Sequence, residues 1–145
     1  MVSYVILIVI GVTLSVGVYS YLKLHLPPKN AECPSNINLI IEGATCTAST
    51  DKLSLTLSNN GLFNVSAAFI RIGELGRKVK PQVNENEEIL EASILPGGQL
   101  PTLQYPTPFN VLQGQTYVVE VQPAIVINKK VIPCESIITQ EVVCS

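Results

Sequence analysis

The sequence has no tryptophan, a single histidine and few charged residues, and these shortages limit the chemistry it can carry. Charged residues make up 14% of the 145 residues, against about 25% in an ordinary soluble domain. The lone His25 leaves little material for a metal or acid–base site. The net charge is −2 and no basic cluster is present, so we expect no nucleic-acid partner.

The shortage of charge is concentrated in the first segment, where the run from Val2 to Leu22 has no charged residue and no Lys or Arg precedes it. As a helix, this run would span about 31 Å, close to the thickness of a bilayer's hydrocarbon layer. It is apolar on all sides, unlike an amphipathic surface helix. We expect one helix from about Val2 to Leu26, ended by Pro27-Pro28.

The four cysteines all lie after the apolar run, two near the start of the remaining chain and two at its end: Cys33, Cys46, Cys134 and Cys144. An even number at the edges of a small domain predicts disulfides formed in an oxidising compartment. Zinc is the rival interpretation. The cysteines of a zinc site usually come in pairs two to four residues apart, whereas Cys33 and Cys46, like Cys134 and Cys144, are separated by many more residues. We expect no metal site.

The apolar run fits neither of two common roles. A secretory signal peptide needs a basic start, a shorter apolar core and a small-residue cleavage site, and none is present. For a plain anchor, Lys23 and Lys29 after the run would place the cysteine-bearing part in the cytoplasm. Disulfides require the opposite side. We therefore expect that a short basic leader has been removed just before Met1.

Cleavage before the hydrophobic segment is how type IV pilins are processed. The run VSYVILIVIGVTLSVGVYSYL and the plan of a bare apolar helix, a break and a small β-rich domain resemble an archaeal type IV pilin. Val5 stands where bacterial pilins carry a glutamate, which departs from the bacterial pattern and suits the archaeal one. The resemblance covers the whole chain at the level of architecture, and its motif is mostly hydrophobicity.

After Pro28 the hydrophobic pattern changes to period two, which is typical of strands with one buried face. In KLSLTLSNNGLF (52–63), leucines alternate with serine and threonine before an Asn-Asn-Gly turn. Short segments of this kind predict strands at 36–43, 64–73 and 88–95 and in the last thirty residues, with 101–115 an irregular or edge segment. We expect an α+β chain, with an N-terminal helix at 1–28 and an immunoglobulin-like antiparallel β-sandwich at 29–145.

Four cysteines allow three pairings. Local pairs, Cys33–Cys46 and Cys134–Cys144, are rejected because the segments between them look extended, and an extended segment holds its ends too far apart for a disulfide. Two long-range pairings stay open from the residues alone, one for antiparallel and one for parallel first and last strands. The immunoglobulin-like analogy implies parallel strands, and hence Cys33–Cys134 and Cys46–Cys144.

We find no catalytic constellation in the sequence and expect neither an enzyme nor a cofactor. LPGGQLP lacks the Lys-Ser/Thr and helix of a phosphate loop, and no Gly-x-Ser-x-Gly elbow is present. The acidic residues Glu85, Glu87, Glu88 and Glu91 lack the spacing of a calcium loop and predict a solvated loop. Asn64-Val65-Ser66 is a glycosylation sequon in a predicted strand, and its occupancy stays open.

A pilin-like role gives the apolar helix a partner: other copies of itself. The subunit would wait in the membrane and then pack with identical subunits into an extracellular helical filament, with the β-domains outside. The small pair Gly11 and Ser15 allows close helix approach. The expected filament core contains Val5, Leu7, Val9, Gly11, Leu14, Ser15, Val18 and Leu22. A singly anchored surface binding domain is the alternative, and an extracellular enzyme is disfavoured by the absent constellation; no surface ligand is identified.

Overall fold

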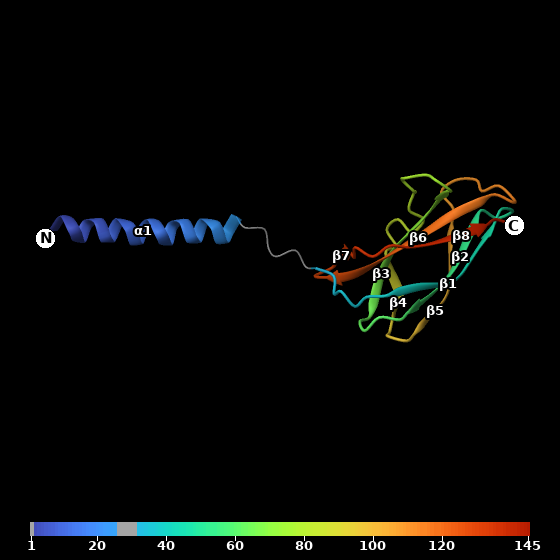
Figure 1. Ribbon diagram of the computed structural model, residues 1–145, viewed down its shortest axis with the longest axis horizontal. Helices are drawn as coiled ribbons and strands as arrows, with labels where there is room; N and C mark the ends of the chain where they lie inside the picture. The colour runs from blue at the N-terminus through green and yellow to red at the C-terminus, as the bar shows by residue number, and fades with distance from the viewer. Residues whose placement is uncertain (1, 26–31) are drawn as a thin grey trace. The chain divides into compact units, whose positions relative to one another are not determined.

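In the computed structural model, the described part of the chain contains one helix followed by eight β-strands (Figure 1). The structure describes residues 2–25 and 32–145. The chain divides into two compact units, Met1–Ala31 and Glu32–Ser145, the second of which we call the β-unit. An apolar helix followed by antiparallel sheets confirms the α+β class expected from the sequence.

Helix α1 spans Val2–His25. It contains no acidic residue in its first turn, and its basic residues, Lys23 and His25, come in its last turn, where they favour the negative end of the helix dipole. The expected end at Leu26, the Pro27-Pro28 break and Lys29 lie outside the described residues.

The β-unit contains two antiparallel sheets. The three-stranded sheet has the order β1-β2-β5, and the larger sheet has the order β4-β3-β6-β7 with β8 also paired to β6. β8 pairs with the first half of the long strand β6, and β7 pairs with the last four residues of β6. The strands are β1 Leu39–Thr47, β2 Lys52–Asn59, β3 Val65–Glu74, β4 Ile89–Ile94, β5 Gln99–Pro106, β6 Thr116–Ile127, β7 Lys130–Pro133 and β8 Ile138–Val143.

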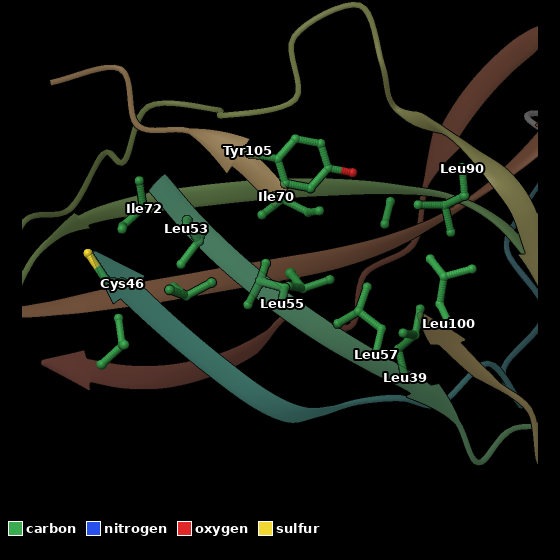
Figure 2. Packing of buried hydrophobic residues seen from close by; sticks show 14 of the residues in the cluster. Leu39, Cys46, Leu53, Leu55, Leu57, Ile70, Ile72, Leu90, Leu100 and Tyr105 are labelled. Atoms are coloured by element: carbon green, nitrogen blue, oxygen red, sulfur yellow. The ribbon is translucent and has the colours of Figure 1, made fainter. Parts of the chain in front are cut away.

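The core contains apolar side chains from both sheets, packed in one cluster (Figure 2). Leu53, Leu55 and Leu57 of β2 are fully buried, which confirms the period-two pattern of this strand. Ser58, on the expected polar side, is buried as well, and its hydroxyl donates to the carboxylate of Glu42 over 2.7 Å. A hydrogen bond to a charged acceptor compensates the burial of this hydroxyl.

The first strand differs from the sequence prediction, because it begins at Leu39 and continues to Thr47 instead of covering 36–43. The residues before it hold the β2–β3 connection: Leu62 donates its backbone N–H to Asn36, and Asn60 donates to Asn38. Gly61 lies tightly between them, where an added Cβ would be 2.5 Å from the Asn36 carbonyl oxygen. Only glycine fits this approach.

The proline-containing segment 101–115 was predicted to be irregular or an edge. Its first part lies in β5, which pairs with β2 alone and is an edge of the three-stranded sheet, and residues 107–115 contain no strand. Pro101 and Pro106 are exposed there. An edge tolerates proline because one side of the strand needs no ladder hydrogen bonds.

Candidate functional site

The helix α1 presents its apolar side chains to its surroundings, because none of its residues is buried. Apolar surface left in water costs about 25 cal/mol per Å². An apolar environment is therefore more favourable for this helix than water. By length and composition it is able to cross a membrane, although a signal sequence would meet the same test.

Two hydroxyl side chains in the middle of α1 are satisfied within the helix itself. Thr13 Oγ1 lies 2.9 Å from the Val9 carbonyl oxygen and 3.0 Å from that of Ile10. Ser15 Oγ donates to the Gly11 carbonyl oxygen over 2.8 Å. Because these groups need no water, the helix can be buried in an apolar environment without leaving them unpaired.

The last turn of α1 has the composition of a membrane–water boundary. The His25 ring stacks on Tyr21, with centroids 4.1 Å apart, and His25 Nδ1 lies 3.0 Å from the Tyr21 carbonyl oxygen. The tautomer protonated at Nδ1 donates to that carbonyl. Tyrosine, histidine and lysine combine apolar bodies with polar ends, so this turn suits an interface.

The residues expected in a filament core lie on two opposite faces of α1. With 3.6 residues per turn, Val5 and Val9 fall on one face and the other six on the opposite one. Those six are Leu7, Gly11, Leu14, Ser15, Val18 and Leu22, and all eight are exposed in the single chain. No single neighbouring helix can cover both faces.

The glycines of α1 are not required by packing within the chain. A Cβ added at Gly11 or at Gly17 would meet no other atom within 4 Å. Glycine costs an exposed helix about 1 kcal/mol relative to alanine. Close approach by something outside the chain would offset this cost.

The β-unit is closed by two disulfides that join its first and last parts, Cys33–Cys134 and Cys46–Cys144. These are the pairs that the immunoglobulin-like analogy implied. Cys46 and Cys144 face each other across a parallel bridge, with Cα atoms 4.5 Å apart. β8 thus ends beside the end of β1 and runs in the same direction.

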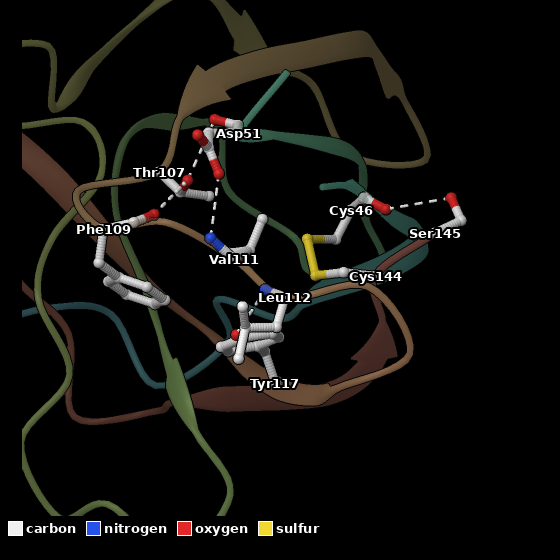
Figure 3. Close-up of a disulfide and its surroundings, with 9 residues drawn as sticks. All are labelled: Cys46, Asp51, Thr107, Phe109, Val111, Leu112, Tyr117, Cys144 and Ser145. Atoms are coloured by element: carbon white, nitrogen blue, oxygen red, sulfur yellow. Dashed lines mark hydrogen bonds between the residues drawn. A yellow bond between two sulfur atoms is a disulfide. The ribbon is translucent and has the colours of Figure 1, made fainter. Parts of the chain in front are cut away.

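The C-terminal residue lies next to the second disulfide and is held in the sheet (Figure 3). Ser145 donates its backbone N–H to the Cys46 carbonyl oxygen over 3.0 Å, and its own carbonyl accepts from Ala48 over 2.8 Å. The Ser145 hydroxyl also points to the Cys46 carbonyl, at 3.4 Å. These bonds extend the β1–β8 pairing to the chain end.

The sequon residue Asn64 is exposed and precedes β3, which begins at Val65. The sequence analysis placed it inside a strand, and this was wrong because the turn after β2 extends through Phe63. An asparagine in an exposed connection is open to a modifying enzyme, whereas one in a paired strand is not.

No family model and no curated protein matches this sequence.

The acidic segment of residues 85–91 is divided between a structural and an exposed role. Glu88 Oε1 accepts from Gln82 Nε2 at 3.2 Å and from the Asn86 backbone N–H at 3.3 Å. Glu87 and Glu91 instead line a groove that also contains Tyr105. Within residues 2–25 and 32–145, no group of three or more His, Cys, Asp or Glu is placed to hold a metal ion.

The sequence analysis missed Tyr105, which it treated as part of an irregular segment. No local pattern marks this residue, because β4 and β5 form the groove together only in the folded unit. Burial, followed by the charges of Glu87 and Glu91, raises the pKa of Tyr105 above its ordinary value of 10.0.

Proposed function

We propose that this protein is a structural subunit of an extracellular filament of the type IV pilus kind, built by packing copies of α1 with the β-units outside. The observation that carries the proposal is the apolar surface of α1 on both of its faces, all of it exposed in the single chain. Several neighbouring helices are needed to cover two opposite faces. A helical array supplies them through heterologous contacts that do not close.

The same helix suits storage in a membrane before assembly. Its hydroxyls at Thr13 and Ser15 are bonded internally, so transfer from lipid to a helix bundle leaves no polar group unpaired. Its apolar surface stays out of water in both states, so the hydrophobic term changes little between them. Assembly then depends on packing, for which Gly11 and Gly17 leave open space.

The β-unit is proposed to be an immunoglobulin-like sandwich that coats the filament. The two sheets, with orders β1-β2-β5 and β4-β3-β6-β7, and the parallel approach of β8 to β1 support this topology. The two disulfides support an oxidising location outside the cytoplasm. The disulfides would also stabilise the β-units on the outer surface of a filament against unfolding.

Electron microscopy of material sheared from the surface of producing cells tests the proposal. We expect filaments whose only major chain has the mass of this sequence, with any glycan added, and whose first residue lies at the start of the apolar run. Loss of the chain from the sheared fraction, with full recovery from detergent-extracted membranes, would contradict it.

A single-pass anchor for a surface binding domain is the second candidate. The span-compatible length and composition of α1 favour it. In that case one chain is surrounded by lipid, and a polar substitution on either face of α1 affects membrane retention alone. Retention of an uncleaved segment before Met1 in the native protein would favour this candidate over the filament.

A further inference from the structure

An open groove of about 470 Å³ lies in the β-unit between two edge strands, β4 of the larger sheet and β5 of the smaller one. Its lining includes Ile89, Leu103, Tyr105 and the carboxylates of Glu87 and Glu91. Ile89 is 56% exposed although it is a large apolar residue. The groove therefore combines apolar surface with negative charge.

Tyr105 contributes a largely buried aromatic side chain to this groove. The residue as a whole is only 8% exposed, but the described residues contain no buried side-chain oxygen or nitrogen that lacks a hydrogen-bond partner. Figure 2 shows the Tyr105 ring at the top of the view, beside the buried cluster. Because Tyr105 lines the groove, a partner that enters the groove meets this side chain.

The charges of the groove select a cationic partner. The only ion pair among the described residues is Lys80–Glu120, so no basic side chain of the β-unit neutralises Glu87 or Glu91. The lining contains fewer metal-ligating groups than a metal site needs. An amine on an apolar stem fits better, because its stem can lie on Ile89 and Leu103 while its head meets the carboxylates.

The tip of the β6–β7 hairpin has the complementary composition. Its two-residue turn consists of Asn128 and Lys129, both with positive φ (49° and 64°), which is the rigid turn typical of tight hairpins. Lys129 and Lys130 are exposed and have no ion-pair partner among the described residues. Ile127 beside them is 37% exposed and adds apolar surface.

We propose that the tip of the β6–β7 hairpin, Ile127–Lys130, of one copy docks into the β4–β5 groove of the next copy. This inference rests on the proposed function, since it supplies a contact between the β-units of neighbouring subunits. The groove and the tip are different surfaces, so the contact is heterologous and propagates as a filament does.

Charge complementarity favours a second copy of the chain as the occupant. The β-unit has seven basic and eleven acidic residues, a formal charge of −4, so identical units placed side by side repel one another. Each tip in a groove brings two amines to two carboxylates and offsets that repulsion. Paired charges of this kind also fix which surfaces meet.

Cross-linking of filaments assembled from equal amounts of ¹⁴N- and ¹⁵N-labelled full chain tests the contact. A carbodiimide joins a carboxylate to an adjacent amine as an amide, with loss of water that converts the carbodiimide to a urea. We expect mixed-isotope peptides that link Glu87 or Glu91 to Lys129 or Lys130. Filaments without such peptides would overturn this inference alone, whereas absence of filaments from the wild-type chain would overturn the proposed function.

Charge reversal supplies the second measurement. Glu87→Lys with Glu91→Lys, or Lys129→Glu with Lys130→Glu, should lower filament yield at least several-fold, and all four changes together should restore at least half of it. Matched controls, Glu85→Lys with Glu135→Lys and Lys52→Glu with Lys78→Glu, alter exposed charges outside the groove and tip and should leave the yield near that of the wild type. Equal losses in the controls, or cross-links to an added polylysine peptide but not to another copy, would overturn the proposal.

Discussion

The side chain of Asn84 is almost fully buried and bonds to the backbone of β3, where no neighbouring strand does so. Its Oδ1 accepts from the Ile70 backbone N–H over 3.0 Å, and its Nδ2 donates to the Ala68 carbonyl over 2.7 Å. β4 pairs with β3 at only two register positions, so this amide completes the edge where the ladder is sparse. Asn59 serves a similar purpose near Ile94 and Phe63.

Replacing Asn84 by alanine should lower the free energy of unfolding by about 2–4 kcal/mol, because it leaves two buried backbone groups unpaired. Denaturant unfolding of the oxidised full chain in detergent measures this change. Asn110→Ala, at an exposed asparagine, is the control and should stay within about 0.5 kcal/mol of the wild type. Equal effects of the two substitutions would show that the amide of Asn84 is not a structural bond.

The ionisation of Tyr105 should make the stability of the β-unit depend on pH in the alkaline range. Its pKa is raised in the folded chain by burial and by Glu87 and Glu91, so the folded chain retains a proton that the unfolded chain loses above about pH 10. The free energy of unfolding should therefore fall as the pH rises from 10 toward the folded pKa. Tyr105→Phe should remove this part of the slope, and the ultraviolet tyrosinate titration of the wild type minus that of the variant should have its midpoint above 10. A midpoint at or below 10 would contradict a raised pKa of Tyr105 in the folded chain.

Sequence patterns located the residues that act locally but not those that act across the fold. The leucines of β2 could be placed because alternation along one strand reports one buried face. The bonds from Asn59 to Ile94 and from Asn84 to Ile70 could not be predicted, because these partners are distant in sequence. The position of Tyr105 in a groove could not be predicted either, because the groove forms only where β4 and β5 come together.

At the scale of the secondary-structure element, α1 is the part of the chain that sequence predicts best. A long charge-free run has one physical interpretation, an apolar helix, and the structure confirms it over Val2–His25. The surroundings of the helix are not encoded so directly, because lipid and a bundle of like helices favour the same composition.

Single charges on the two faces of α1 should each prevent assembly. Val9→Asp on one face and Leu14→Lys on the other would each place a charge in an apolar core at a cost of at least a few kcal/mol. Electron microscopy should show no filaments for either variant, with the disulfides of the β-unit still formed. Val9→Leu and Leu14→Met are the apolar controls and should assemble.

The comparison of the two faces separates the possible surroundings of α1. A helix pair would tolerate the charge on its outer face, whereas a filament core tolerates neither. Normal filaments from either charged variant would show that the face in question is not buried in the core.

At the scale of the whole β-unit, the disulfides tie its beginning to its end. The Cys33–Cys134 and Cys46–Cys144 pairs are separated by 101 and 98 positions, so each closes most of the unit into a loop. The parallel direction of β1 and β8 decides the pairing, and the cysteine spacing alone could not. That direction follows from the order of strands in two sheets, which no local pattern reports.

Replacing Cys33 and Cys134 by serine should lower the free energy of unfolding by up to about 4–5 kcal/mol, through the entropy gained by the unfolded chain. Thermal unfolding without reductant measures the loss, and Ser145→Ala, which retains both disulfides, is the control. Proteolysis without reductant followed by mass spectrometry checks the pairing, and a linked Cys33–Cys46 peptide would refute it.

The disulfides limit how far the β-unit can be extended when it is pulled between its first and last residues. An unlinked chain pulled between Cys33 and Ser145 could lengthen to about 400 Å when fully extended. With the disulfides in place, the shortest covalent path crosses from Cys33 to Cys134 and continues along β8, so the extension stops at about 40 Å. A pulling force between these residues is therefore carried by covalent bonds. The strands that lie between Cys33 and Cys134 in the sequence are protected from unfolding by this force. A β-unit pulled between Cys33 and Ser145 should therefore not lengthen beyond this limit while the Cys33–Cys134 disulfide is intact.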